Sequence, residues 1–481
     1  MRKAALAVAD AGFRVTLVWG DHLASTVVEG ELGPVRTIGL PVPYLLRDAR
    51  ARQIIRRRAW RPGWPAYRDR GSLRAAVVRL QAASARAEGR GIGARLVLRF
   101  RAFVNGVRSK AFAFQERVFA SLWRRLDRRR LGNLPHVNWR RELANVADLE
   151  AAFTKWLWRL EPDAIHVHDI HLLGAGVQAK RRLAKRGRRV PLVYDAHEYV
   201  SGLAGKDPVA EAAYAAMEAE LIGDADAVIT VSEPIADALV TRYGLPRRPT
   251  VVLNSPSAEG RAVCATDVRS AAGVASSDPL VVYAGGLGRL RNVPAAIRAL
   301  PLLDGVHLAV VCVPDTSHAG ARALVAVAAE EGVEDRVHLL EPVPPEETVS
   351  FLATADIGIH PMLTGVANHE MALPNKLFDY LFAGLPVVVS KVAEMDRFVH
   401  RWRVGETFDP DDPADLAAAV RVVLADLSDY ATRTCDPALR GDYSWERQAE
   451  EIRQLYSATP GWWNDKSVAR PGVQMLPSED V

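Results

Sequence analysis

Two series of short apolar segments, each ending in polar residues, restrict the folds that this sequence can adopt. The first series contains AIHVHD, PLVYDAHE and AVITVSE, and the second contains LVVYAGGLG, HLAVVCV, VHLLEPV, DIGIHPM and PVVVS. Stretches of helical periodicity separate the members of each series. This alternation predicts an α/β protein with parallel sheets, and the variable polar stretch at 254–278 predicts a boundary between two such domains.

The first series begins inside a βα unit. KAALAVADAGF is expected to form a helix closed by Gly12, and RVTLVWG the next strand, so the strand that usually precedes such a helix is missing. We expect an N-terminal domain at 1–255, a C-terminal domain at 278–440 and a C-terminal helix at 441–457. The Pro- and Gly-rich residues 460–481 are expected to be disordered.

Composition excludes several classes of protein. The chain has 481 residues, 49% hydrophobic and 25% charged, which is typical of a globular enzyme and excludes collagen, coiled coil and overall disorder. No apolar run approaches the ~18 to 20 residues of a membrane-spanning helix, and we expect no cleaved signal peptide. Three widely spaced cysteines indicate neither a disulfide framework nor a zinc site, so we expect a cytoplasmic protein.

Positive charge is concentrated in one segment. Residues 47–142 hold 26 Lys and Arg against 6 Asp and Glu, a net charge of +20, whereas the rest of the chain carries −15. Between Leu96 and Leu126, apolar residues recur at three- and four-residue steps among arginines, which predicts a basic amphipathic helix inserted in the N-terminal domain.

Three roles are open for this basic insertion. Its apolar stripe could pack on the N-terminal domain, bind an anionic membrane surface or bind nucleic acid. Neighbouring tryptophans such as Trp60 and Trp123 favour peripheral contact with the inner face of the cell membrane. No helix-turn-helix, RNP or zinc-finger pattern supports nucleic acid, which we do not expect as a partner.

Polar side chains follow two strands of the first series, where each strand is predicted to end. The carboxyl ends of parallel strands meet at one crevice, so we expect these side chains to line it. By a period of two we expect His166 to point to the face opposite His168 and to be a core residue. The residues expected in the crevice are His168, Asp169, His171, His197 and Glu198.

Two other classes of site are disfavoured. Four histidines near carboxylates allow a metal site, but no HExxH or other regular ligand spacing supports one, and we expect no metal. A dinucleotide-dependent oxidoreductase would also contain alternating strands and helices. It is disfavoured because no GxGxxG follows a predicted strand.

Six motifs together resemble those of the retaining glycosyltransferases of family 4, which have the GT-B fold. They are EPDAIHVHDIHLLGAG, VPLVYDAHE, ADAVITVSEPIADAL, VVLNSP, VVYAGGL and ALPNKLFDYLFAGLPVVVS, in the family's order and spacing. The resemblance covers most of 1–457 outside the basic segment. It implies two Rossmann-like domains facing across a cleft, with a nucleoside-diphosphate sugar bound by the C-terminal domain, an acceptor bound by the N-terminal domain, and no cofactor or metal. Without a metal, cations and helix N-termini must stabilise the diphosphate leaving group.

The resemblance assigns the loop YAGGLGRLRN to the donor. Gly285 and Gly286 permit close approach of the backbone, and Arg291 stands where the family places a Lys or Arg that contacts the phosphates. The family often has a second arginine at the position of Gly286, for which Arg289 is the expected replacement. Both arginines could instead be exposed loop residues.

The segment NHEMALPNKLFDY also falls on the donor side. Asn375 and Lys376 open a helix, where free N–H groups and the ammonium could meet the diphosphate or sugar. Family members carry a Glu-x7-Glu pair here. In this chain Asp379 replaces the second Glu, expected on the ribose, and Met371 replaces the first, with Glu370 beside it. A branch of the family written NxxxALPNKLFEY also lacks the first Glu.

The function expected from these residues is sugar transfer from a nucleoside-diphosphate sugar to a cell-surface glycan or lipid-linked acceptor, with retention. His168, which aligns with the family's crevice histidine, Arg291 and Lys376 are the expected catalytic residues. Asp169, His171, His197 and Glu198 are expected on the acceptor side. The alternative is an inactive GT-B scaffold or partner subunit, suggested by the missing strand, Gly286 and Met371.

Overall fold

A computed structural model of the chain describes residues 1–21, 24–60, 62, 65–87, 92–132, 137–204, 207–259, 262–458 and 472–476. The chain divides into two compact units. The first comprises Met1–Val42, Leu149–Asp207 and Met217–Val481, and the second comprises Pro43–Asp148 and Pro208–Ala216.

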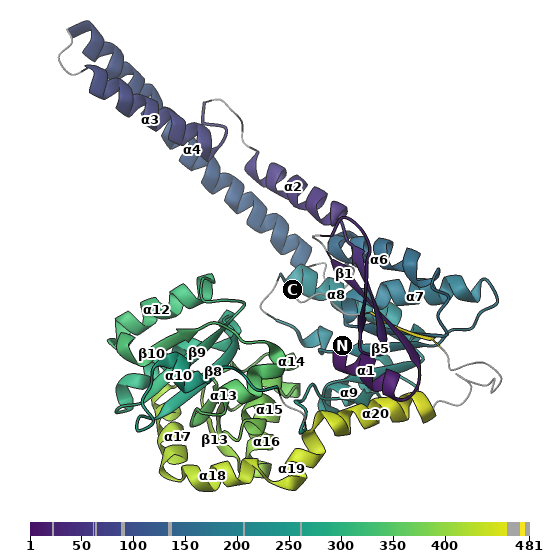
Figure 1. Ribbon diagram of the computed structural model, residues 1–481. Coiled ribbons are helices and arrows are strands. Elements are labelled where there is room, and N and C mark those ends of the chain that lie inside the picture. Colours follow the sequence, from purple (N-terminus) through teal and green to yellow (C-terminus); the bar gives the residue numbers. More distant parts are fainter. Residues whose placement is uncertain are drawn as a thin grey trace. The chain divides into compact units, whose positions relative to one another are not determined.

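The C-terminal half of the first unit is built on a six-stranded, all-parallel sheet with helices on both faces (Figure 1). Its order β10-β9-β8-β11-β12-β13 is the Rossmann order. The order reverses beside β8, so the carboxyl end of β8 lies at the switch point where such sheets bind ligands. The strands are β8 (Leu280–Gly286), β9 (His307–Val313), β10 (Val337–Leu340), β11 (Ile357–His360), β12 (Val387–Ser390) and β13 (Gly405–Phe408).

Alternating side chains of these strands feed two cores, one on each face. Val281 and Tyr283 of β8 belong to one core, and Leu280 and Val282 to the other. Burial on both faces explains why the second-series segments are continuous apolar runs. The helices are α10 (Val268–Ala272), α11 (Val293–Ala299), α12 (Ala319–Glu331), α13 (Thr348–Leu352), α14 (Ala367–Met371), α15 (Asn375–Phe382), α16 (Ala393–Trp402), α17 (Pro413–Ala425), α18 (Leu427–Thr434) and α19 (Pro437–Tyr443).

The N-terminal half of the first unit contains an eight-stranded sheet of order β2-β3-β1-β14-β4-β5-β6-β7. Neighbouring strands are parallel except for β2 and β3. The prediction of an α/β protein with two Rossmann-like parallel sheets is confirmed. The strands are β1 (Arg14–Asp21), β2 (Val28–Leu32), β3 (Val35–Pro41), β4 (Ala164–His168), β5 (Leu192–Ala196), β6 (Ala227–Thr230), β7 (Thr250–Val251) and β14 (Gly472–Leu476).

Helices α1 (Arg2–Asp10), α6 (Ala144–Leu157), α7 (Ile170–Ala184), α8 (Pro208–Leu221) and α9 (Glu233–Tyr243) accompany these strands in the sequence. The C-terminal helix, expected at 441–457, is α20 (Trp445–Ala458). It packs on α1, and its Ile452 and Tyr456 are buried in the N-terminal core. The chain therefore returns to the N-terminal sheet after completing the C-terminal one.

The position between β1 and β4 is filled by β14. In the Rossmann order the first strand of the sheet would lie at this position, and β14 pairs with both neighbours. Residues 460–481 were expected to be disordered; this is wrong for Gly472–Leu476, and the other residues of that range lie outside the described part of the chain.

The second unit consists mainly of helices and contains the basic segment expected at 47–142. Its long helices α3 and α4 lie side by side (Figure 1), and the amphipathic helix expected from Leu96 to Leu126 falls within α4. None of the described helices is both long and apolar enough to cross a membrane. The helices are α2 (Leu45–Ala59), α3 (Arg70–Ala87), α4 (Ile92–Gly132) and α5 (Trp139–Glu142).

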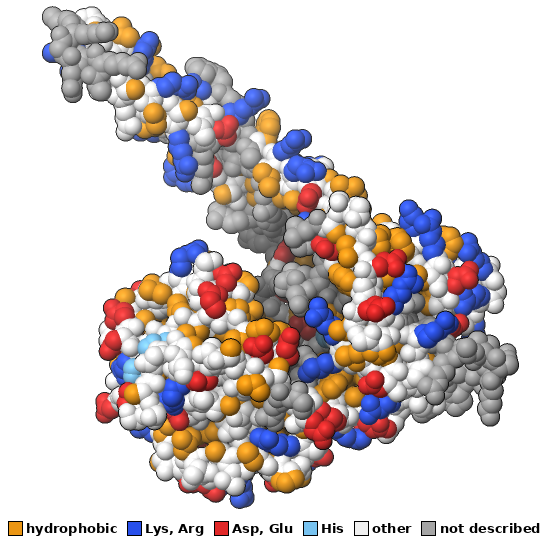
Figure 2. Space-filling model, in the orientation of Figure 1, with side chains coloured by type: hydrophobic (Ala, Val, Ile, Leu, Met, Phe, Trp, Pro, Cys, Tyr) orange, Lys and Arg blue, Asp and Glu red, His pale blue; other side chains and the backbone are white. Residues whose placement is uncertain are grey.

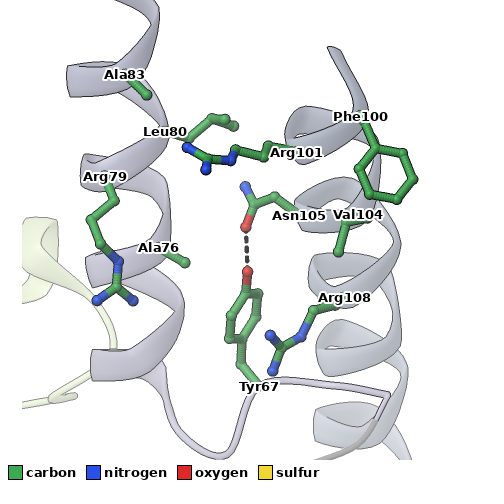
Figure 3. A pocket seen from close by; sticks show the side chains of 10 residues that line it. All are labelled: Tyr67, Ala76, Arg79, Leu80, Ala83, Phe100, Arg101, Val104, Asn105 and Arg108. Atoms are coloured by element: carbon green, nitrogen blue, oxygen red, sulfur yellow. Dashed lines mark hydrogen bonds between the residues drawn. The ribbon is translucent and has the colours of Figure 1, made fainter. Parts of the chain in front are cut away.

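Tyr67, in the segment that precedes α3, joins this segment to α4. Its hydroxyl donates to Asn105 Oδ1 at 2.5 Å, and the Arg108 guanidinium lies 4.3 Å from the ring centroid (Figure 3). The Tyr67 ring also packs in a small core with Ala66 and Phe112. A cavity of about 340 Å³ lies between the two helices, lined by Tyr67, Ala76, Arg79, Leu80, Ala83, Phe100, Arg101, Val104, Asn105 and Arg108.

Candidate active site

A cavity of about 430 Å³ lies within the first unit, at the carboxyl ends of both parallel sheets. Both halves of the unit contribute to its wall, as expected for a ligand site in a protein of two Rossmann-like halves. The lining residues are His197, Glu198, Val231, Asn254, Ala284, Gly285, Arg291, Met362, Asn368, His369, Ala372, Leu373, Pro374, Asn375, Lys376 and Asp379.

Gly285, the penultimate residue of β8, has a φ of +139° and makes room for Lys376. A Cβ at this position would lie 2.6 Å from Lys376 Nζ, closer than atoms can approach. The ammonium also lies 5.1 Å from the centroid of the Tyr283 ring. The glycine thus allows a buried lysine to reach the end of β8.

Lys376 and Arg291 bring two positive charges to the same wall. Burial, together with the positive charge of Arg291, lowers the pKa of Lys376 to about 7. Arg291 lies in a 3₁₀ turn directly after β8, with Nη1 4.0 Å from Met362 Sδ. Because Arg291 disfavours the charge of Lys376, a bound anion that contacts both groups would favour the protonated lysine.

Helix α15 begins at the cavity, with Pro374 as its N-cap and Asn375 and Lys376 in its first turn. The first N–H groups of a helix have no intrahelical partner and attract anions. The opposite face of α15 anchors it, with Leu377 and Leu381 buried in the core. The predicted combination of N–H groups and lysine at this helix start is present.

Asp379 follows one turn after Lys376. Burial raises the pKa of Asp379 to about 6, although the charges of Lys3 and Lys376 lower it. Lys3, at the start of α1, donates to the Ser255 carbonyl at 3.0 Å. Nothing in the sequence pattern pointed to Lys3, because the charge that it places near Asp379 comes from the other half of the unit.

Three residues expected to bind the donor do not line the cavity. Both carboxylate oxygens of Glu370 accept from backbone N–H groups at 2.8 Å, those of Gly365 and Ala393, which gives the side chain a structural role. Arg289 is exposed. Gly286 accepts a hydrogen bond from the Tyr283 hydroxyl through its carbonyl at 2.6 Å.

On the N-terminal side, His197 and Glu198 line the cavity as expected, and behind them lies a buried cluster around Asp195. Asp195 Oδ2 lies 2.9 Å from His168 Nδ1, 3.5 Å from His197 Nε2 and 3.7 Å from His166 Nε2. His168 is therefore not in the cavity wall but behind His197, whose Nε2 lies 3.1 Å from His168 Nδ1.

His166 and His168 share one face of β4. Their rings stack with centroids 4.5 Å apart, so the expectation that they point to opposite faces is wrong, whereas His166 lies in the core as expected. Side chains two residues apart in a strand share a face. Both rings are fully buried, and His166 Nδ1 lies 2.9 Å from the Tyr456 hydroxyl of α20.

Within this cluster the ionised form of Asp195 and the protonated form of His197 are favoured. Burial and the nearby His166 keep the pKa of His168 well below its usual value, so this ring is neutral. Burial alone would raise the pKa of Asp195, but the charge of His197 and hydrogen bonds from three imidazoles hold it well below its usual value. Burial likewise opposes protonation of His197, yet Asp195 raises the pKa of this imidazole.

Asp169 and His171 lie at the start of α7. Asp169 caps the helix by accepting from the Ile170 N–H, with a φ of +69°. His171 Nδ1 lies 3.3 Å from Asp169 Oδ1. Burial opposes the charge of Asp169, but hydrogen bonding to His171 lowers the pKa of the carboxyl below its usual value. Both residues are near the predicted crevice but not in the cavity wall.

One group of residues in the described chain has the geometry to hold a metal ion: His166, His168 and Asp195, whose ligand atoms all lie within 4.8 Å of one another. Their contacts are already those of a hydrogen-bonded network, with 2.9 Å between His168 Nδ1 and Asp195 Oδ2.

Two further residues escaped the sequence analysis: Asn368, which lines the cavity, and His360, which does not. Asn368 Oδ1 accepts from the Tyr199 N–H at 2.7 Å, which joins the two halves of the unit. His360 ends β11 and is fully buried. Burial and the charges of Lys376 and Arg291 keep its pKa well below its usual value. The strand end in DIGIHPM was a signal for His360, whereas the contact of Asn368 depends on tertiary structure.

Comparison with known proteins places this chain in a class. Residues 105–255 match the family Glycosyltransferase Family 4, and residues 278–426 match Glycosyl transferases group 1. The structure resembles sucrose-phosphate synthase from Thermosynechococcus elongatus with a TM-score of 0.59 and 16% identity, covering 95% of this chain and 93% of that one. It also resembles the Anabaena protein HepE in complex with UDP-glucose, with a TM-score of 0.52 and 19% identity over 66% of this chain and 82% of that one. The fold is GT-B.

Among curated proteins, the chain is 28% identical to D-inositol 3-phosphate glycosyltransferase of Nocardia farcinica over 287 residues, which are 56% of this chain and 62% of the relative. It is 25% identical to glycogen synthase of Mycobacterium tuberculosis over 312 residues, which are 63% of this chain and 69% of that protein. The chain thus matches less than two thirds of the length of the first relative. The predicted resemblance is confirmed: the chain belongs to the family 4 glycosyltransferases.

Proposed function

We propose that this chain transfers a sugar from a nucleoside diphosphate to an acceptor hydroxyl, with retention at the anomeric carbon. The observation that carries the proposal is the convergence of Lys376, Arg291 and the N-terminus of α15 beyond the end of β8. In the reaction the acceptor oxygen bonds to the anomeric carbon, and the bond from that carbon to the phosphate oxygen breaks with its electron pair remaining on that oxygen. The departing diphosphate takes up the proton that the acceptor hydroxyl releases. Negative charge grows on the diphosphate, where these groups are placed to stabilise it.

The remaining cavity residues fit the two ends of such a substrate. Asp379 is proposed to accept a hydrogen bond from a ribose hydroxyl, since it lies one helical turn beyond Lys376 on the cavity wall. His197 and Glu198 are proposed to face the acceptor, because they line the same cavity from the N-terminal half. We propose that His168 acts on the acceptor through His197, which separates it from the cavity.

No divalent metal is needed in this scheme, because protein cations take the place of the ion. The alternative of an inactive scaffold was suggested partly by a missing central strand, and β14 occupies that position. The departures at Gly286 and Met371 remain, but Gly286 does not line the cavity and its loop still supplies Arg291.

The acceptor is proposed to be a cell-surface glycan or lipid-linked sugar at an anionic membrane, reached from the cytoplasmic face. Along α4, apolar side chains form a stripe exposed to solvent, with Phe100 67% and Phe103 69% exposed. Basic and apolar side chains intermix over the helices of this unit (Figure 2). The stripe comprises Leu96, Phe100, Phe103, Val107, Phe114, Val118, Leu122 and Leu126.

The positive charge around this stripe favours an anionic membrane as its binding partner over a second copy of the helix. A second copy of the same helix would bring its own arginines against those of the first, which is unfavourable, whereas anionic phospholipid offers both opposite charge and an apolar interior.

The test of the catalytic proposal is a thermal-shift screen of the full chain against a panel of sugar nucleotides. A ligand that binds only the folded state raises the melting temperature, and a panel without any shift would contradict donor binding.

A further inference from the structure

A strand from the end of the chain fills the middle of the N-terminal sheet. Residues 472–475 of β14 lie opposite 14–17 of β1, and residues 473–476 lie opposite 164–167 of β4. The segment is therefore hydrogen-bonded in parallel along both of its edges. Its place between β1 and β4 is the central one, where an unfilled gap would divide the sheet into two parts.

One side chain of this strand is anchored in the core. Met475 is 0% exposed and packs in the cluster that contains Val15 and Leu17 of β1, Ala164 of β4 and Tyr456 of α20. Backbone pairing combined with a buried side chain is the way in which extended peptides bind to sheets.

The sequence limits this segment to a short strand. Pro471 and Pro477 stand on either side of GVQML. Proline has no N–H to donate to a ladder, so pairing is confined to the five residues between the two prolines. The other seven strands of the sheet come from residues 14–251, and this one is added from the last part of the chain.

We propose that the gap between β1 and β4 is a strand-binding groove whose ligand is the chain's own segment Gly472–Leu476, and that filling the groove orders the carboxyl end of β4. With the groove empty, both neighbouring strands would expose unpaired N–H and C=O groups in the middle of a sheet. The space of Met475 would become a cavity in the core.

Strand β4 links the pairing of β14 to the candidate active site. This strand carries His166 and His168, and Asp169 follows it as the cap of α7. Both histidines contact Asp195, which lies on the neighbouring strand β5. The last part of the chain thereby controls the order of the cluster behind His197.

Cysteine pairs introduced into this 481-residue chain test which strand occupies the groove. Thr16 and Gln474 are register partners, so the double variant Thr16→Cys with Gln474→Cys should form an intramolecular disulfide under mild oxidation. The control Arg14→Cys with Leu476→Cys is four residues out of register and should not. The proposal would be overturned if the paired variant forms no cross-link. It would also be overturned if the cross-link is found only in dimers, because the strand would then come from a second copy.

Hydrogen exchange tests the effect on β4 without relying on catalysis. Met475→Asp places a charge in the core and should raise amide exchange in β1 and β4 at least tenfold, while the C-terminal strands keep their protection. Met475→Leu should retain the protection. Unchanged exchange in β4 of a folded Met475→Asp protein would overturn the proposal; if that variant does not fold, the cysteine pair decides.

Discussion

Lys376 occupies the space that any side chain at Gly285 would need, since a Cβ there would lie 2.6 Å from its Nζ and 2.9 Å from its Cε. We therefore expect Gly285→Ala to displace the ammonium and to weaken sugar-nucleotide binding by about tenfold or more, the loss of one charged hydrogen bond. Gly286→Ala is the matched control, because nothing lies within 4 Å of a Cβ at that position. Titration calorimetry on both variants measures the effect, and equal affinities would separate Lys376 from the donor.

Donor binding should take up a proton at Lys376. Burial and the charge of Arg291 lower the pKa of Lys376 to about 7, so at pH 8 this side chain is mostly neutral in the empty site. A bound diphosphate would favour its protonated form. Calorimetry at pH 8 in two buffers of different ionisation enthalpy measures the uptake. In Lys376→Arg the uptake should vanish, because arginine stays protonated. The same uptake in both proteins would contradict the assignment.

The same group makes the stability of the empty protein depend on pH. The folded pKa of Lys376 lies below the unfolded value of 10.5. Between these two values the unfolded chain binds more protons, so this group makes the free energy of unfolding rise as pH rises from about 7 toward 10.5. Denaturant unfolding of the wild type and of Lys376→Met, measured across this pH range, should show a smaller rise of the free energy of unfolding in the variant. An identical pH dependence would mean that the folded protein does not lower the pKa of Lys376.

Asp379 should be required for the nucleoside part of the donor. Asp379→Ala is expected to weaken sugar-nucleotide binding by about ten- to a hundredfold, as for the loss of a hydrogen bond to a charged group, whereas Asp379→Glu should largely retain it. A ribose contact predicts that the free nucleoside diphosphate loses affinity to the same extent as the sugar nucleotide. Three proteins of equal affinity would remove Asp379 from the site.

The exposed stripe of α4 should bind vesicles that contain anionic phospholipid. Replacing Phe100 and Phe103 together by Ser should reduce binding at least tenfold, because each buried phenyl group contributes about 1.5–3 kcal/mol. Val422→Ser, at an exposed apolar position of the C-terminal half that is 50% exposed, is the control. Co-sedimentation at low and high salt should show loss of binding at high salt. Absence of binding to anionic vesicles at low salt would leave the stripe without a membrane role.

Local patterns predicted the two sheets and most of the donor side. Strand ends are visible in a sequence because apolar runs stop at polar residues, and this located His197. Arg291 was assigned through the family resemblance, and Lys376 through the predicted start of a helix. Gly285 was recognised for its backbone, and the structure adds the side chain that requires it. The shared face of His166 and His168 also follows from strand periodicity, which the expectation misapplied.

Long-range contacts account for what the sequence did not predict. The pairing of β14 with β1 and β4 joins opposite ends of the chain, and five residues between two prolines carry too little pattern to indicate a central strand. Glu370 resembled a donor ligand by position, but its partners are Gly365 in the loop before α14 and Ala393 at the start of α16. Lys3 enters the neighbourhood of Asp379 only after the two halves of the first unit have come together.

The central claim is that cations of this chain, in place of a metal, stabilise a departing nucleoside diphosphate. It is tested most directly by release of nucleoside diphosphate from the sugar nucleotide that binds, measured in EDTA with the acceptor present. We predict full turnover of the wild type and of Arg289→Ala, whose arginine is exposed, and turnover lowered by about 10² to 10³-fold in Arg291→Ala. Turnover that requires added magnesium or manganese, or that is the same in Arg291→Ala as in the wild type, would contradict it.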